Sequence, residues 1–85
     1  MVLEAMYLPA DRRVVRRIGD LAEIYRGSAP VVDIPVRQED LATMAGTTRQ
    51  TANQVLKQLE DDGVVTLRRG GVAIVQLDEL RRRAR

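Results

Sequence analysis

The 85-residue chain contains no cysteine and no histidine. The lack of cysteine excludes disulfides and thiolate metal sites, and it is compatible with a reducing compartment. Without either residue type, the usual nucleophile–base pairs, the common zinc ligands and the side chain most often used as a general base near neutral pH are missing. Composition therefore argues against most classes of enzyme.

Carboxylates are the remaining candidates for catalysis, but the acidic residues occur where helix caps, helix ends or solvated faces explain them. These residues are Asp33, Glu39, Asp40, Glu60, Asp61, Asp62, Asp78 and Glu79. Because no two of them form a recognisable acid–base pair, we predict that the chain is not an enzyme. We also expect no catalytic residue, no metal and no cofactor within it.

Aromatic residues and long apolar runs are scarce as well. Phe and Trp are absent and Tyr occurs twice, so the core must consist of Val, Leu, Ile, Ala and Met. An apolar content of 45% over this length suffices for one small domain. There is no apolar run long enough for a membrane span, and the N-terminus lacks the features of a signal peptide. We therefore expect a soluble, cytoplasmic chain without a membrane partner.

Positive charge is concentrated at the C-terminal end of the sequence. The formal net charge of +2 is too small to indicate nucleic acid by itself. From Val64 to Arg85, however, six arginines stand against only Asp78 and Glu79. The end of the short terminal segment DELRRRAR is expected to fray, and the tail is either a solvated terminus or a basic arm.

The first predicted helix starts at Pro9, which suits the first helical position, and stops at Gly27. Its apolar stripe consists of Val14, Ile18, Leu21, Ala22 and Tyr25. The other side carries four arginines, for which a solvated face is favoured over phosphate contact: Arg12, Arg13, Arg16 and Arg17. After a loop, Val32–Ile34 is followed by Pro35, which predicts a short edge strand.

Two short amphipathic helices separated by a glycine follow. The first is predicted over about 37–45, with Leu41, Met44 and Ala45 inward. Gly46 ends it, and Thr48 is a suitable N-cap because its hydroxyl can accept from a free backbone N–H of the next helix. That second helix is expected to start at Arg49 and to stop at Gly63. The pattern is that of a helix-turn-helix.

The second helix has two distinct faces. Its apolar residues recur at i, i+3, i+4 and i+7, and they are Ala52, Val55, Leu56 and Leu59. The outward face consists of Gln50, Asn53, Gln54 and Lys57. Such amides can match base edges in the DNA major groove, although a solvated polar face is the alternative. The acidic run 60–62 would repel phosphates, so the N-terminal half of the helix is expected to touch the ligand.

A hairpin follows this helix. Val64–Leu67 and Val72–Gln76 are β-branched apolar runs on either side of two arginines and two glycines. The hairpin tip is expected to present Arg68 and Arg69 beside the helix pair. Together with the edge strand, the order of elements predicts an α+β winged helix-turn-helix, with a three-helix core, a small antiparallel sheet and a β-hairpin wing.

At this point the chain resembles a known family. The DNA-binding domain of the cyclic-AMP receptor protein (Crp/Fnr) family of bacterial transcription regulators is similar to the string QEDLATMAGTTRQTANQVLKQLEDDGVV and to its flanks EAMYLPADRRVVRRIGDLAEIY and LRRGGVAIVQLDELRRRA. The resemblance implies a winged helix DNA-binding domain over 9–85. It also implies that 1–8 are the end of, or a hinge after, an upstream dimerisation helix.

The resemblance carries further expectations about partners and effectors. It implies a homodimer in the full-length protein, a pseudo-palindromic double-stranded DNA operator, and RNA polymerase as a candidate partner. A cyclic nucleotide or another effector would bind in an upstream domain rather than in this chain.

Site residues follow from the resemblance position by position. Arg49 matches a base-reading arginine, and its guanidinium can satisfy guanine O6 and N7 together. The family often has a glutamate and a second arginine where this chain has Gln50 and Gln54, so the family's best-known half-site does not transfer. The residues expected to read bases are Arg49, Gln50, Asn53 and Gln54. Those expected to bind phosphate are Thr48, Thr51, Lys57, Arg68 and Arg69.

A winged helix that serves only as a protein-interaction module is the alternative function. An arginine beside three amides suits base edges, whereas the core of a protein interface usually exposes aromatic residues or methionine. The sequence therefore favours DNA over an acidic protein partner.

Overall fold

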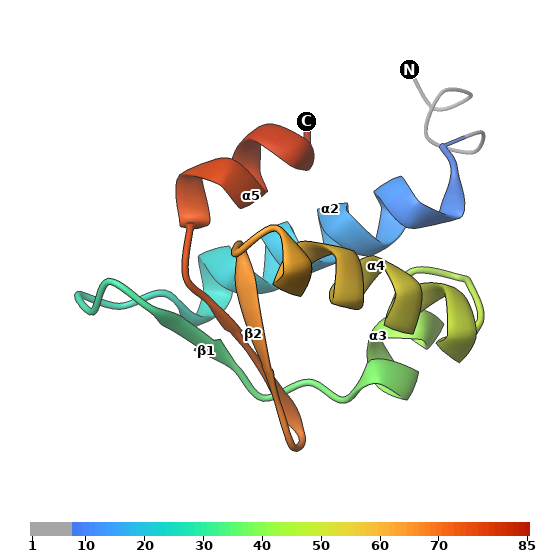
Figure 1. Ribbon diagram of the computed structural model, residues 1–85, viewed down its shortest axis with the longest axis horizontal. Helices are drawn as coiled ribbons and strands as arrows, with labels where there is room; N and C mark the ends of the chain where they lie inside the picture. Colours follow the sequence, from blue (N-terminus) through green and yellow to red (C-terminus); the bar gives the residue numbers. More distant parts are fainter. Residues whose placement is uncertain (1–7) are drawn as a thin grey trace.

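The structure is a computed structural model that describes residues 8–85 (Figure 1). Its helices are α2 (Ala10–Tyr25), α3 (Gln38–Met44), α4 (Arg49–Asp61) and α5 (Leu77–Arg83), and its strands are β1 (Val32–Ile34), β2 (Val65–Arg68) and β3 (Gly71–Ile74). The winged helix-turn-helix fold is confirmed. The predicted end of a dimerisation helix lies, apart from Leu8, outside the described residues. None of the described helices combines the length and apolarity needed to cross a membrane.

The three strands form one antiparallel sheet in the order β1-β3-β2. Ile74 of β3 lies opposite Val32 of β1 on one side and opposite Val65 of β2 on the other. Because β3 is central, β1 is an edge strand, as its three-residue length and the following proline predicted. The β2–β3 hairpin extends away from the helices to a tip at the bottom of Figure 1.

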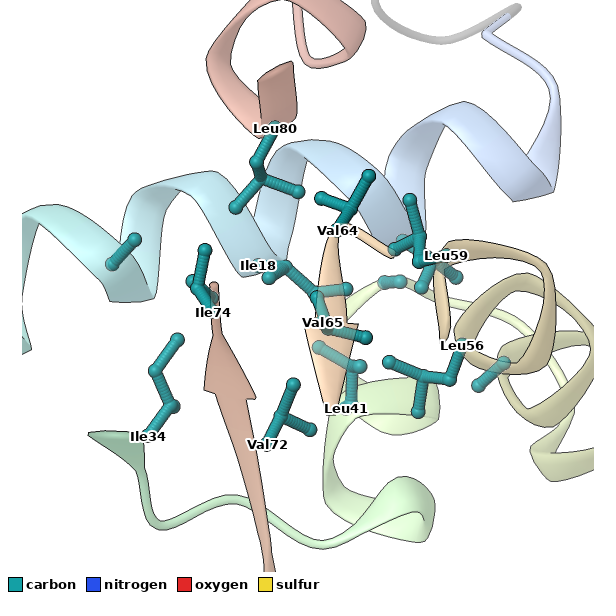
Figure 2. Packing of buried hydrophobic residues seen from close by; sticks show 14 of the residues in the cluster. Ile18, Ile34, Leu41, Leu56, Leu59, Val64, Val65, Val72, Ile74 and Leu80 are labelled. Carbon is teal, nitrogen blue, oxygen red and sulfur yellow. The ribbon is translucent and has the colours of Figure 1, made fainter. Parts of the chain in front are cut away.

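The core lies where this sheet meets the helices (Figure 2). Val14, Ile18 and Ala22 of α2 are buried, as are Leu56 and Leu59 of α4. Their partners from the sheet and from α5 include Ile34, Val65, Val72, Ile74 and Leu80. The periodic stripes of α2 and α4 therefore predicted the buried faces, with Val55 at the margin as a half-buried residue.

Two residues expected in the core are exposed instead. Tyr25 is 48% exposed and Met44 is 42% exposed. Each is the last residue of its helix, where the chain turns away from the packed region. The inward face of α3 consists of Leu41, Ala42 and Ala45. A seven-residue helix needs no longer side chain than these to close against α4.

The helix-turn-helix is bounded by local signals. Gly46 and Gly63 have φ values of 65° and 77°, left-handed conformations that end α3 and α4 at the predicted glycines. Thr48 caps α4, because its hydroxyl oxygen accepts from the Thr51 backbone N–H at 3.1 Å. Helix α3 starts one residue later than predicted, since Arg37 is still extended (φ −84°, ψ 155°).

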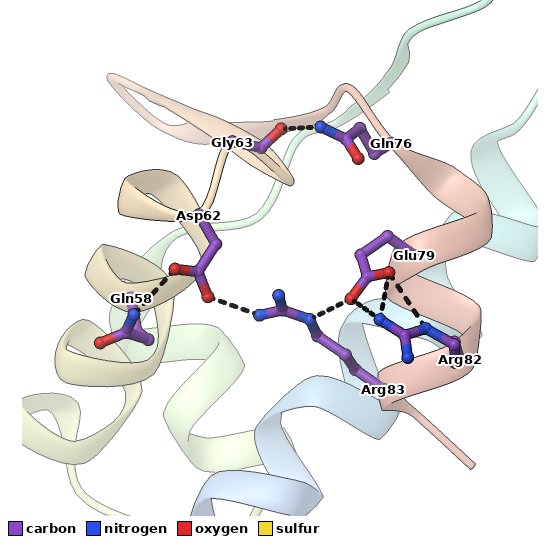
Figure 3. A network of polar contacts seen from close by, with 7 residues as sticks. All are labelled: Gln58, Asp62, Gly63, Gln76, Glu79, Arg82 and Arg83. Atoms are coloured by element: carbon purple, nitrogen blue, oxygen red, sulfur yellow. Dashed lines mark hydrogen bonds and ion pairs between the residues drawn. The ribbon is translucent and has the colours of Figure 1, made fainter.

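The C-terminal segment contains a helix that was not predicted, and only residues 84–85 follow it. This helix is α5, whose Leu80 is fully buried. Arg83 joins α5 to the end of α4 by donating to Asp62 Oδ2 at 2.7 Å, and it also donates to Glu79 Oε2 within α5 at 2.7 Å (Figure 3). Hydrogen bonds from Arg82 and Arg83 hold the pKa of Glu79 below its ordinary value, and the bond from Arg83 lowers the pKa of Asp62. Sequence signals missed the helix because its stability comes from contacts with distant segments.

The four arginines of α2 also have specific contacts. Arg12, Arg16 and Arg17 are exposed, as predicted for a solvated face, whereas Arg13 is half-buried. Their guanidinium groups form two sets. Arg13 and Arg17 donate to backbone carbonyls at the end of α3, and Arg12 and Arg16 donate to the carbonyls of two residues after α5. One helix thus supplies cations to the C-terminal ends of two others, where the helix dipole favours them.

Candidate nucleic-acid interface

A cleft of about 620 Å³ lies between the helix pair and the hairpin. It is bounded by the start of α3, the start of α4 and the wing. The residues that line it are Val36, Arg37, Gln38, Glu39, Arg49, Leu67, Arg68, Arg69, Gly70, Gly71 and Val72. Four arginines and a single carboxylate give this concave surface a positive character, which favours an anionic ligand.

Arg49 occupies the position that its predicted role requires. It is the first residue of α4, it is exposed, and it lines the cleft. Within residues 8–85, no acidic side chain forms a salt bridge with it. Its guanidinium fork therefore remains available for a planar acceptor pair.

The predicted outward face of α4 is divided in the structure. Gln50, Gln54 and Lys57 are exposed. Asn53 is half-buried, because its amide donates to Gln38 Oε1 at 2.8 Å and bridges α4 to α3. Asn53 thus lies on the polar side of α4, as periodicity predicted, but periodicity could not show that α3 lies beside it.

The two threonines at the start of α4 form a local hydrogen-bonded unit. Besides capping the helix, the Thr48 hydroxyl donates to Thr51 Oγ1 at 3.1 Å. The Thr51 hydroxyl proton is not needed for these contacts, so Thr51 retains a donor. Thr48 has its hydroxyl proton engaged within the cap, which makes it the weaker candidate for a phosphate contact.

The wing presents its two arginines differently. Arg68 is the last residue of β2 and lies opposite Gly71, while Arg69 and Gly70 form the turn. Arg68 Nη1 lies 3.2 Å from Asp33 Oδ1 on β1, with both side chains more than half exposed. Arg69 is exposed at the tip. Both arginines therefore lie beside the helix pair, as predicted, since both line the cleft, and Arg68 is in addition paired with Asp33.

Sequence reasoning overlooked two residues of the cleft, Arg37 and Gln38. Both stand at the start of α3, which faces the wing only because the sheet folds the hairpin back towards it. A cation and an amide at the start of the helix-turn-helix were the available signal. Their position could not be recognised without knowing which segment lies opposite.

The carboxylates at the end of α4 do not line this cleft. Glu60 Oε2 accepts from the Leu67 backbone N–H at 3.1 Å, and Asp62 pairs with Arg83. Helix α4 separates these carboxylates from Arg49 by roughly 18 Å along its axis, at 1.5 Å per residue. The polarity expected from the sequence, with the N-terminal half towards an anionic ligand, therefore fits the structure.

Known proteins share this arrangement. Residues 12–83 match the model of a family described as the Crp-like helix-turn-helix domain. The catabolite activator protein of Thermus thermophilus is 33% identical with a TM-score of 0.74, over 88% of this chain and 33% of that protein. A transcriptional regulator of the CRP/FNR family from Thermus thermophilus is 20% identical with a TM-score of 0.83, over 96% of this chain and 44% of that one. A CRP-family regulator from the same organism is 21% identical with a TM-score of 0.80, over 94% of this chain and 42% of that one.

The two less identical structures show the fold alone, and comparison with curated proteins finds no match. The chain matches between 33% and 44% of the length of these three regulators. The family match, by contrast, covers the helix pair, the hairpin and α5. The chain therefore belongs to the Crp-like helix-turn-helix family and is a DNA-binding domain of the kind found in Crp/Fnr transcription regulators.

Proposed function

We propose that this domain binds double-stranded DNA sequence-specifically, with the recognition helix 48–62 in the major groove, as part of a bacterial transcription regulator. The observation that carries the proposal is the positive cleft, which the first residue of α4 and the wing both line. A helix of α4's dimensions fits the major groove, and a wing beside it can reach the adjacent backbone.

Base recognition falls to the exposed N-terminal half of α4. Arg49 reads a guanine through O6 and N7, a contact that discriminates by about 1–3 kcal/mol. Gln50 and Gln54 are exposed amides suited to adenine. Asn53 belongs to the proposed base-reading set through its place on this face, although its contact with Gln38 competes with that role.

Phosphate contacts fix the position of the helix without reading sequence. Arg69 at the wing tip and Lys57 on α4 are exposed donors, and the half-buried Thr51 keeps a hydroxyl proton free to donate. Thr48 and Arg68 complete the proposed set, and each must first give up a contact within the protein.

The longer regulator is proposed to be a homodimer on a pseudo-palindromic operator. Two copies of this domain would enter successive major grooves about one helical turn apart. An effector such as a cyclic nucleotide would bind in an upstream domain, and RNA polymerase is the proposed protein partner. Dimerisation would raise affinity for the palindrome through effective concentration, so the single domain is expected to bind DNA modestly and with strong salt dependence.

The test is selection of bound sites from a randomised duplex pool, followed by binding measurements on Arg49→Ala. The variant should lose preference at one guanine position, by about 5- to 150-fold, while its affinity for random duplex falls only as much as the loss of one charge requires. Arg26→Ala is the matched control, because Arg26 is an exposed arginine at the far end of α2, paired with Glu23. Unchanged guanine preference in Arg49→Ala would refute the assignment. Absence of any duplex binding by the unmodified chain would favour the protein-interaction module instead.

A further inference from the structure

We infer that Arg13 is a positioning residue for DNA recognition, because a single guanidinium on α2 holds both the turn of the helix-turn-helix and the chain just before α2. This inference rests on the proposed function. Arg13 does not line the cleft and is assigned no contact with DNA. It acts through the backbone that leads into α4.

Three backbone carbonyls surround the Arg13 side chain. Its Nε donates to the Ala45 carbonyl at 2.8 Å, one terminal nitrogen to Leu8 at 2.6 Å, and the other to Gly46 at 3.1 Å. All three guanidinium nitrogens are thus engaged, and the side chain is half-buried. The guanidinium is planar and its donors are preorganised. Its contact with three carbonyls therefore restricts both the Arg13 side chain and the backbone that carries these carbonyls.

The need for this cation arises in α3 itself. The last carbonyls of a helix lack partners within the helix, and α3 has no basic residue in its own last turn. Ala45 is the C-cap of α3, and Gly46 is the residue whose φ of 65° turns the chain. Arg17 assists by donating to the Met44 carbonyl at 3.1 Å. The backbone N–H groups of Gly46 and Thr47 cap α3 by bonding to the Thr43 and Ala42 carbonyls. Helix α2 supplies donors to the carbonyls that this cap leaves over, those of Met44, Ala45 and Gly46.

Recognition depends on this turn because it is short. Only Thr47 and Thr48 separate Gly46 from Arg49, the proposed base-reading residue. A shift of the turn would move the start of α4. The two hydrogen bonds that Arg49 is proposed to donate to a base edge tolerate little displacement. The bond to Leu8 extends the same link to the chain that enters α2.

The experiment compares Arg13→Ala with Arg16→Ala in the full chain. Arg16 is the matched control because it lies on the same helix, carries the same charge and also caps a C-terminal end, donating through Nε to Ala84 after α5. Two properties are measured. The first is amide hydrogen exchange at Gly46 and Thr47, whose N–H groups bond to carbonyls within α3. The second is affinity for the selected site and for random duplex over a range of salt.

Arg13→Ala should raise exchange at both amides by about tenfold over the control, since it removes charged hydrogen bonds to the turn. The ratio of selected-site to random affinity should fall by about tenfold, while the salt slope matches that of the control. Arg13→Lys should restore this ratio only partly, because one ammonium cannot span three carbonyls. Full restoration by Arg13→Lys would overturn the role of the fork.

Two other results would also overturn the inference. Equal specificity ratios in Arg13→Ala and Arg16→Ala would limit Arg13 to stability. A uniform loss of affinity with a salt slope about one unit smaller than the control would make Arg13 a phosphate ligand. If the unmodified chain binds no duplex, the proposed function fails, whereas the exchange rates still report separately whether Arg13 holds the turn.

Discussion

Replacing Asp33 should strengthen the proposed DNA binding, because its carboxylate is paired with Arg68 of the wing. Its carboxylate lies 3.2 Å from Arg68 and is the acidic group that the sheet brings against the hairpin. A phosphate at Arg68 must displace or share this carboxylate, and it meets the repulsion of a nearby negative charge. Asp33→Asn removes both effects while keeping the size of the side chain and its place in β1.

The magnitude follows from the exposure of the pair. With side chains 59% and 67% exposed, the pair should contribute about 0.2–1 kcal/mol to stability. A phosphate that binds Arg68 has to replace this ion pair, so the free energy of the pair is subtracted from the free energy of binding. Asp33→Asn removes the pair and should raise affinity for random duplex by up to about fivefold at low salt. The salt slope should steepen by up to about one unit, because Arg68 gains full access to phosphate. The midpoint of thermal unfolding should fall by no more than about 8 °C.

The assay is titration of fluorescent random duplex at several salt concentrations, with Asp78→Asn as the control. Asp78 is also an exposed aspartate near an arginine, with its Oδ1 3.7 Å from Arg81 Nη1, but it lies on α5, on the opposite side of the molecule from the hairpin tip (Figure 1). Both substitutions change the net charge equally. An equal gain in the two variants would reduce the effect to net charge, and no gain from Asp33→Asn would show that Arg68 does not bind phosphate.

Three further predictions concern stability. Leu56→Ala, at a fully buried position, should cost about 2–5 kcal/mol, against about 1 kcal/mol for the half-buried Val55→Ala; equal losses in urea unfolding would contradict the observed burial. Gly46→Ala should cost about 1–2 kcal/mol through its φ of 65° alone, because no atom within 4 Å would meet the new Cβ; an unchanged melting temperature would contradict this. The pKa values of Glu79 and Asp62 are lowered by pairing with arginines, so this pairing stabilises α5 fully above the ordinary pKa values of 4.5 and 3.8. The contribution is lost as the pH falls through the lowered values. Circular dichroism should therefore show loss of helix on acidification through this range, and a flat acid profile would contradict the prediction.

Much of the helix-turn-helix could be predicted because its determinants are local. Gly46 and Gly63 stop helices by backbone conformation, and Thr48 caps α4 with an atom of its own side chain. Each signal lies within a few residues of its effect. The apolar period of α4 likewise predicted a buried face, since the helical repeat sets the direction of every side chain.

The candidate site was predicted less completely, because several of its contacts join distant segments. Asn53 meets Gln38 on the preceding helix, and Arg68 meets Asp33 on a strand far away in the sequence. Pattern reasoning placed Asn53 and Arg68 among polar, solvent-facing residues, which is correct for their chemistry. It could not state which polar group stands opposite, and that partner decides whether a side chain is free to bind a ligand.

The arginines of α2 show where a sharper inference from sequence is available. Periodicity placed four cations on the outer side of this helix, and a solvated face was the simplest explanation. Yet α3 ends without any basic residue in its last turn, and its backbone cap at Gly46 leaves the carbonyls of Met44, Ala45 and Gly46 to other donors. Arg13 and Arg17 are spaced i and i+4, so they lie one turn apart on one side of α2 and can reach neighbouring carbonyls at the end of a crossing helix. A helix end without a cation of its own in one segment and a paired set of arginines in another therefore form a long-range signal, which predicts packing as well as charge.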